Sequence, residues 1–295
     1  TSSNTDTIIF QGTKTYTVAN NLTLTGADGS ELYLTSDDEV ATATLSNTGG
    51  AQSVDYVRVL KVDGTDANHI AATNSWDVDG TLSFWDFGEM LFTFATTGDW
   101  DNASNWEQNR LPAETDNILI SPGQTLTLNG DRTINDIDVD GTIDVATNAF
   151  TVNGESDIDG TITVTTGTVD ANGAFDATFG TITFSGAGNL TLASTVESLG
   201  TLSGNGTVTY DGTDQTVFGD LYYSLTAGGG SGTKTLGGAV TVSGDLTIDP
   251  VVTIAMGAND LTVTGVTVID GVLAVADNIM TLDGASDIGG TITIS

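Results

Sequence analysis

The chain has 295 residues, and its 39 acidic side chains against 6 basic ones give a formal net charge of −33 at pH 7. This charge excludes the basic footprint that nucleic acids require and disfavours docking on anionic lipid. The absence of cysteine excludes disulfides and thiolate catalysis. No apolar run is long enough to span a membrane, so we expect no membrane insertion.

Short runs of alternating apolar and polar residues fill the first third of the chain. Examples are "NLTLTG" (21–26) and "ELYLT" (31–35), which place Leu on one face and polar side chains on the other. Gly, Asn or Asp punctuates nearly every run, whereas helical periodicity is nearly absent. This pattern is typical of short strands joined by tight turns. We expect a β-solenoid segment over residues 1–97.

The string "DVDGT" at residues 77–81 matches the Asp-x-Asp-Gly-Thr signature of haloacid-dehalogenase-like phosphatases, in which the first Asp is the nucleophile. That chemistry needs a buried strand before the nucleophile, and "AATNSW" before Asp77 is no such strand. Nearly the same string returns at 138 and at 157. Since a nucleophile is not normally supplied three times, we interpret the string as the corner of a repeated coil.

One segment interrupts the strand pattern. Residues 98–122 carry Trp100, Trp106 and two of the chain's three prolines. We expect an irregular linker or loop here, between two solenoid stretches. Trp100 and Trp106 are candidates for stacking on sugars, although most tryptophans in loops fix the loop to the core.

The rest of the chain, residues 123–295, is periodic. "GTI" begins at 141, 160 and 180, and "GTL" begins at 200, so the steps are 19, 20 and 20 residues. Repeats of this length indicate a solenoid, in which equivalent strands of successive coils pair in parallel about 4.8 Å apart. The sequence therefore predicts an all-β fold, a right-handed parallel β-helix with coils of about 20 residues. A β-sandwich array is the main alternative.

A 19-residue offset relates two aspartate pairs. It places Asp138 beside Asp157 and Asp140 beside Asp159 on adjacent coils. Carboxylates about 5 Å apart repel each other, and a bound Ca²⁺ would convert that repulsion into coordination. These four residues are therefore candidate calcium ligands, and the alternative is an acidic face in solvent.

The C-terminal sequence "ASDIGGTITIS" (285–295) echoes "ESDIDGTITVT" (155–165). We therefore expect the solenoid to have an uncapped C-terminal end. The end of a solenoid is an open sheet edge that another element must cover. We expect self-association end to end, either of copies of this chain or of tandem modules.

Three stretches resemble repeats of large bacterial surface proteins. They are "QSVDYVRV" with the closing "NSWDVDG" and "FWDF" (within 29–87), "GDWDNASNWEQNRLPAETDNILISPGQTLTL" (98–128) and "FGDLYYSLTAGGGSGTKTLGGAVTVSGDLTI" (218–248). The chain is similar to adhesin-like extracellular β-helix proteins, akin to haemagglutinin and autotransporter passengers. The resemblance implies an extracellular, prokaryotic cell-surface location and a structural or adhesive role, and it carries over no catalytic residues.

These observations predict a non-enzymatic extracellular structural protein, a rod that stacks into a fibre or forms part of a long surface filament. One alternative is a carbohydrate-binding adhesin that uses Trp100 and Trp106 and has glycans as partners. The minor alternatives are ice binding by Thr-x-Thr rows such as Thr161 and Thr163, and a polysaccharide-degrading enzyme.

Overall fold

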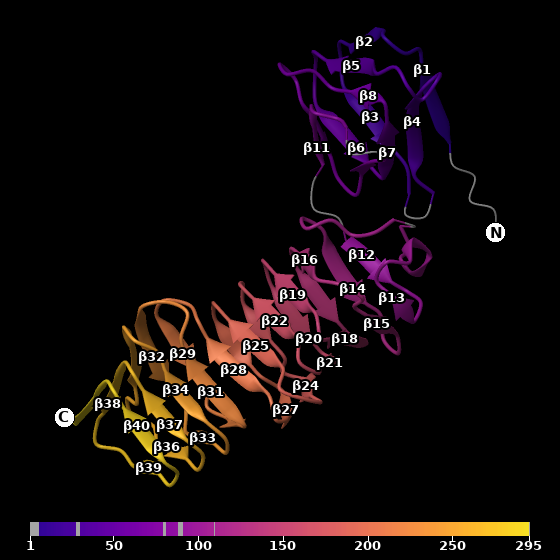
Figure 1. Cartoon of the computed structure of the whole chain (residues 1–295). Coiled ribbons are helices and arrows are strands. Elements are labelled where there is room, and N and C mark those ends of the chain that lie inside the picture. The colour runs from indigo at the N-terminus through magenta and orange to yellow at the C-terminus, as the bar shows by residue number, and fades with distance from the viewer. Residues whose placement is uncertain (1–5, 28–29, 79–80, 88–90, 109, 295) are drawn as a thin grey trace. The chain divides into compact units, whose positions relative to one another are not determined.

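The structure is a computed structural model that describes residues 6–27, 30–78, 81–87, 91–108 and 110–294. Nearly all of it is β-structure, with parallel strands stacked in a solenoid of about 13 turns. The prediction of an all-β parallel β-helix is thereby confirmed. The chain forms two compact units, residues 1–91 (unit 1) and residues 92–295 (unit 2), whose strands are labelled in Figure 1.

Unit 1 contains four parallel sheets with long and uneven coils. Residue 7 pairs with residue 33 and residue 22 with residue 52, whereas residue 70 pairs with residue 85. The coils of unit 1 therefore depart from the expected 20 residues. Its sheets are β1 (Thr7–Phe10), β4 (Leu32–Ser36), β7 (Val57–Leu60) and β10 (Trp76–Asp77); β2 (Thr15–Val18), β5 (Ala43–Asn47) and β8 (Val62–Asp63); β3 (Leu22–Thr25) and β6 (Gln52–Asp55); and β9 (Ile70–Ala72) and β11 (Trp85–Phe87).

The core of unit 1 is built from the inward side chains of these strands. Leu34, Val57, Val59, Val62 and Ile70 are fully buried. Asp77, the first aspartate of the phosphatase-like string, lies in β10, and its Oδ2 accepts the backbone N–H of Leu82 at 2.7 Å. The second aspartate of that string lies outside the described residues.

Unit 2 is a regular solenoid whose coils have three faces. One nine-stranded sheet runs along its length, and four shorter sheets make up the other two faces. The long sheet contains β16 (Arg132–Ile134), β19 (Ala149–Val152), β22 (Thr168–Ala171), β25 (Asn189–Leu192), β28 (Thr207–Tyr210), β31 (Ser224–Ala227), β34 (Leu246–Ile248), β37 (Thr267–Ile269) and β40 (Ser286–Ile288).

The other two faces of unit 2 each change sheet partway along the solenoid. Two sheets cover the earlier coils. One contains β12 (Leu91–Phe94), β14 (Asn117–Ile120), β17 (Ile137–Val139), β20 (Ser156–Ile158), β23 (Phe175–Asp176) and β26 (Val196–Ser198), and the other contains β13 (Gly98–Asp99), β15 (Thr125–Thr127), β18 (Thr142–Ala146), β21 (Thr161–Val164), β24 (Thr181–Phe184) and β27 (Thr201–Gly204). Two sheets cover the later coils: one contains β29 (Gln215–Val217), β32 (Gly232–Leu236), β35 (Val252–Ala255), β38 (Val272–Val275) and β41 (Thr291–Ile294), and the other contains β30 (Leu221–Tyr222), β33 (Val240–Val242), β36 (Leu261–Val263) and β39 (Met280–Leu282).

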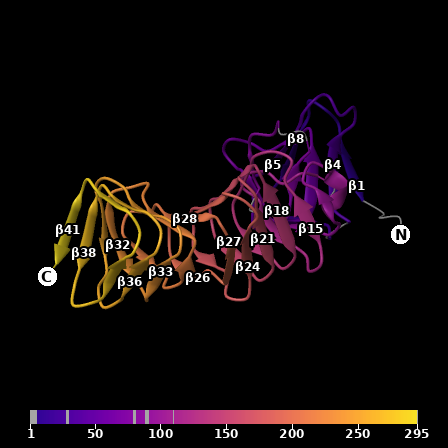
Figure 2. The ribbon, with the colours of Figure 1, turned by 60° about the horizontal axis from the view of Figure 1, so that its bottom comes forward.

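The two earlier sheets end at β26 and β27, and the two later sheets begin at β29 and β30. The long sheet continues through this point, because β28 pairs with both β25 and β31. Figure 2 shows β26, β27 and β28 next to this change of sheets. We call it the sheet break: two of the three faces lose their backbone ladder within the same coil.

The repeated "GTI" string forms a corner of the coil. Val139 points inward while Asp138 and Asp140 face solvent, and the N–H of Gly141 donates to the carbonyl of Ile120 one coil earlier. A Cβ on Gly160 would lie 2.0 Å from the carbonyl oxygen of Gly141. The corner therefore requires glycine because successive coils approach too closely for any side chain.

The segment 98–122 belongs to unit 2 and forms most of an enlarged coil. It contains β13, a 3₁₀ turn η1 (Ala103–Asn105) and β14, and residue 98 pairs with residue 126, an offset of 28. Elsewhere in unit 2 paired residues are 17 to 22 apart, as 125 with 142 and 176 with 198 show. The extra residues of this coil form the turn that carries the two tryptophans.

Replacing an inward side chain tests this arrangement. Ile182→Ala in β24 removes a fully buried side chain from the core column, and we expect it to lower the free energy of unfolding by about 2–5 kcal/mol. Thr183→Ala, which changes the neighbouring outward side chain, is the control and should cost at most about 0.5 kcal/mol. Urea denaturation followed by circular dichroism measures both. Equal effects would contradict the assigned strand faces.

Candidate functional site

The predicted aspartate pairs occupy the expected places. Asp138 in β17 pairs directly with Asp157 in β20, which confirms the predicted register. Asp157 pairs in turn with Asp176 in β23, a third member that the sequence did not reveal because no Asp-Gly string follows it. Asp140 and Asp159 follow at equivalent corners, where their N–H groups donate to the carbonyls of Ile120 and Val139. We call Asp138, Asp157 and Asp176 the aspartate ladder.

Electrostatics in the aspartate ladder disfavour the charged state. Partial burial, followed by the neighbouring carboxylates of Asp140, Asp157 and Asp159, raises the pKa of Asp138. The pKa of Asp157 is raised by the same two causes, burial first. Within the described residues, no group of three or more His, Cys, Asp or Glu side chains is arranged to hold a metal ion. Calcium binding at Asp138, Asp140, Asp157 and Asp159 stays a prediction.

The two candidate sugar-binding tryptophans lie in the core at the start of unit 2. Trp100 is 2% exposed and Trp106 is 1% exposed. The indole N–H of Trp106 donates to the carbonyl of Trp100 at 3.0 Å, and the two rings pack edge to face at 5.0 Å. Phe92, Phe94 and Phe150 surround them. Neither ring offers a face on which a sugar could stack.

Threonine rows line one face of unit 2. On the β13–β27 sheet the outward residues Thr142, Thr161, Thr181 and Thr201 pair in register. A second row two residues along contains Asp144 and Ser203 as well as Thr163 and Thr183. Ice binding by this face stays a prediction.

Buried polar side chains hold the sheet break together at β29. The amide of Gln215 donates to the carbonyls of Leu192 and Ser194 in the preceding coil, at 2.8 and 2.9 Å. Lys234 pairs with Gln215 in the ladder and is fully buried, and its ammonium donates to the carbonyls of Gly212 and Thr213. Burial lowers the pKa of Lys234. These side-chain hydrogen bonds take the place of the backbone bonds that are lost where the ladder is interrupted.

Two buried tyrosines brace the break at β30. The hydroxyl of Tyr222 donates to the carbonyl of Phe218 at 2.6 Å, and the N–H of Phe218 donates to the hydroxyl of Tyr210 at 3.0 Å. The two hydroxyls are 3.0 Å apart, and the hydroxyl of Tyr210 donates its proton to that of Tyr222. Burial raises the pKa of Tyr210 to about 12 and raises that of Tyr222 further. Both rings are fully buried.

Sequence reasoning missed the sheet break and its four polar residues. One signal was present, because alternation in "GTKTL" (232–236) places Lys234 on the same face as the inward Leu236. A lysine on an apolar face indicates a local set of buried acceptors. The pairing of Tyr210 with Tyr222 leaves no comparable mark in the sequence.

Comparisons of the chain with protein-family models, with curated proteins and with solved structures find no match. The structure by itself identifies a β-helix repeat protein. In the part of the chain that the structure describes, no helix has both the length and the apolar character needed to cross a membrane.

The raised pKa values in the aspartate ladder predict the effect of removing one charge. The carboxyls bind protons more tightly in the folded state, so folding becomes less favourable as pH rises through their raised pKa values. We expect Asp157→Asn to raise the melting temperature at neutral pH and low salt. The gain should shrink in high salt and vanish below about pH 4, where carboxyls are protonated.

Differential scanning calorimetry with and without a chelator measures this effect. Asp287→Asn is the control, because Asp287 faces Val268 in the ladder rather than another carboxylate. If Asp157→Asn lowers the melting temperature in calcium, and the chelator abolishes the difference, the ladder binds Ca²⁺ and the repulsion argument fails.

The tyrosine pair makes a second prediction. Tyr222→Phe leaves the proton of the Tyr210 hydroxyl without an acceptor and the Phe218 carbonyl without this donor, so we expect a loss of about 1–3 kcal/mol in urea denaturation. Because the folded state binds both phenolic protons more tightly, wild-type stability should also fall as pH rises above about 10. Tyr222→Phe should reduce that alkaline loss. Tyr223→Phe, at an exposed ring, is the control, and an equal loss there would contradict the assignment.

Proposed function

We propose that this chain is a non-enzymatic structural protein of the prokaryotic cell surface, a β-solenoid rod that stacks end to end into a fibre or forms part of a long surface filament. One observation carries the proposal: within the described residues, the coil that contains β40 and β41 leaves a cross-section of the core exposed. Ile288 is 48% exposed, whereas Ile269, its ladder partner one coil earlier, is fully buried. Ile294 is 78% exposed, whereas its partner Val275 is 6% exposed.

The backbone at this end is open as well. β39, β40 and β41 are the outermost described strands of their sheets, so within the described residues each has one edge without a paired strand. Open strand edges next to exposed apolar side chains are a template for pairing with another chain. A coil of a second copy, stacked with its inward residues above Ile288 and Ile292, would continue both the ladder and the core.

The basic side chains support a structural role. A polysaccharide lyase on this fold would need a basic residue in its site, and most of the six basic residues here take part in packing or hydrogen bonds. Their contacts are Arg58 over the ring of Tyr33, Arg110 over Phe92, Arg132 towards Trp100, Lys61 to Thr81 and the buried Lys234.

The acidity supports an extracellular location. A chain with a net charge of −33 repels its copies at low ionic strength and associates more easily where salt screens it. The likeness of its repeats to bacterial surface proteins points the same way. Trp100 and Trp106, the candidate sugar-binding residues, are buried, which favours the structural role over the carbohydrate-binding alternative.

Charged substitutions at the last coil test the stacking. Ile292→Lys places an ammonium on the core cross-section, above the fully buried Leu273, and should abolish association. Thr293→Lys adds the same charge on the outward face of the same strand and should leave it intact. Analytical ultracentrifugation and negative-stain electron microscopy, at increasing protein and salt concentration, detect fibres. Monodisperse short rods of the wild type at every concentration would refute end-to-end assembly.

A further inference from the structure

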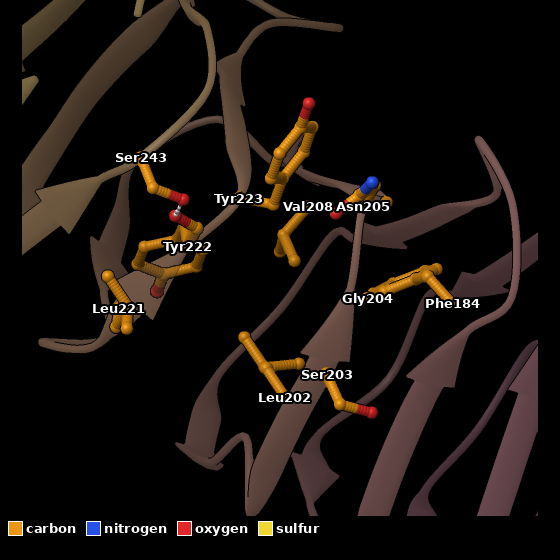
Figure 3. A pocket seen from close by; sticks show the side chains of 11 residues that line it. Phe184, Leu202, Ser203, Gly204, Asn205, Val208, Leu221, Tyr222, Tyr223 and Ser243 are labelled. Carbon is orange, nitrogen blue, oxygen red and sulfur yellow. Dashed lines mark hydrogen bonds between the residues drawn. The ribbon is translucent and has the colours of Figure 1, made fainter. Parts of the chain in front are cut away.

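The sheet break exposes two strand edges that face the same groove. β27 is the last strand of its sheet and β30 the first strand of the next, and among the described residues no backbone ladder joins them. Between them lies a groove of about 290 Å³, which Figure 3 shows with its lining side chains. Its size is near the lower end of ordinary ligand pockets.

Backbone groups of both strands point into this groove. The N–H of Thr201 bonds back to Gly180, and alternate residues of a parallel strand bond to opposite neighbours, so Leu202 and Gly204 direct their backbone groups away from β24. On β30 the carbonyls of Asp220 and Tyr222 bond to β33, which leaves the backbone of Leu221 directed into the groove.

The core is also incomplete at the groove. The inward column of the β13–β27 sheet runs through Val164 and Phe184 and then reaches Gly204, which has no side chain. Gly204 has φ +88, and a Cβ there would lie 1.8 Å from the carbonyl oxygen of Phe184, so the position must be glycine. Leu202 is half-buried, although Ile182 one coil earlier is fully buried.

The far side of the groove is apolar and exposed. Leu221 is 59% exposed and Tyr223 is 44% exposed, both on the rim beside β30. Neither of the two edges pairs with a described strand, the core column lacks a side chain, and the rim is apolar. These three features together match an extended strand with an apolar side chain facing inward. A small polar molecule would leave the strand edges unpaired.

The charges beside the break indicate the kind of strand. Asp220 precedes β30, Glu197 lies exposed in β26, and Asp214 lines a second pocket of about 310 Å³ between β26 and β29. The side chain of Asp220 holds the N–H of Leu221 at 2.7 Å, and an added strand would replace that bond with one from its own carbonyl. With 39 acidic and 6 basic residues, a second copy of this chain is a poor source of a complementary strand, so the charges favour a segment of another protein.

We propose that the groove between β27 and β30 binds an extended segment of another protein by β-strand addition, with an apolar residue facing inward and Lys or Arg beside it. The segment lies parallel to both strands and exchanges backbone hydrogen bonds with Leu202, Gly204 and Leu221. Main-chain bonds supply the affinity in this mode and the alternate side chains supply the specificity. The bonds are few, so we expect a dissociation constant in the range of about 10 μM to 1 mM.

The first test uses a fluorescein-labelled peptide, KGTITVTK, in which lysines flank a strand sequence of this chain, and measures its fluorescence anisotropy. Leu202→Pro removes the N–H directed into the groove while leaving the bonds of β27 to β24, and should weaken binding about tenfold or more. Ile292→Pro is the matched control: because the Thr291 N–H bonds to Gly271, the backbone N–H of Ile292 is directed away from β38, at the outer edge of β41 and outside the groove. It should bind like the wild type.

Two further peptides separate the contributions to binding. KGTPTPTK cannot form the ladder, and EGTITVTE carries the opposite charge. Both should bind at least about tenfold more weakly than KGTITVTK. Absence of saturable binding of KGTITVTK up to about 1 mM would overturn the proposal. So would equal binding to Leu202→Pro, which would place the peptide at the end of the rod.

A second test locates the peptide without relying on proline. The chain has no cysteine, so Leu221→Cys introduces a unique thiol on the rim of the groove. We expect this variant to exchange with a KGTCTVTK peptide whose cysteine is activated as a 2-pyridyl disulfide, forming the protein–peptide disulfide and releasing 2-thiopyridone, much faster than Val251→Cys. Val251 is 79% exposed and does not line the groove. Equal cross-linking rates would overturn the proposal. Stacking into fibres depends on the last coil and would be unaffected by either result.

Discussion

The whole structure depends on the parallel register between successive coils. An inward side chain of a solenoid is covered only by the coils before and after it. Ile269 is fully buried between Ile248 and Ile288, whereas Ile288, in the same column but in the outermost described strand of its sheet, is 48% exposed. A shift of one residue would turn every side chain of a strand to the opposite face. Coils of different length therefore differ in the length of their turns, while their strands keep the same register.

The sheet break shows what happens where this register is lost. A polar group that leaves water without a hydrogen bond costs free energy, so interrupting two ladders at once would be expensive without replacements. Gln215 and Lys234 supply donors to the carbonyls of neighbouring turns, and Tyr210 and Tyr222 bond to both backbone groups of Phe218. On the face between β27 and β30 no ladder joins the two strands in the described part of the chain, and the groove lies there.

The features that the sequence predicted correctly are properties of single strands and single corners. Alternation marks the inward face, and the glycine of each "GTI" corner marks where coils touch, so fold class and the Asp138–Asp157 pairing followed from spacing. Residues 98–122 and unit 1 were harder, because their coils differ in length from the repeat. The sheet break lies in residues that look like ordinary short strands. It depends on which strands pair across coils, and a single sequence does not encode that pairing locally. The burial of Trp100 and Trp106 likewise depends on how an enlarged coil closes over the core.

A strongly acidic chain can still form a solenoid of about 13 turns because repulsion and cohesion act over different distances. Cohesion comes from the ladder and the core between adjacent coils, about 4.8 Å apart. Repulsion between exposed carboxylates reaches about 10 Å at 0.1 M salt, which is about two coils, and about 30 Å at 0.01 M. In salt, each coil therefore repels only near neighbours such as Asp138 and Asp157, and the same neighbours hold it through the ladder. The electrostatic cost per coil then stays constant however long the rod becomes, so the length of the solenoid is limited by the covering of its ends and not by its charge.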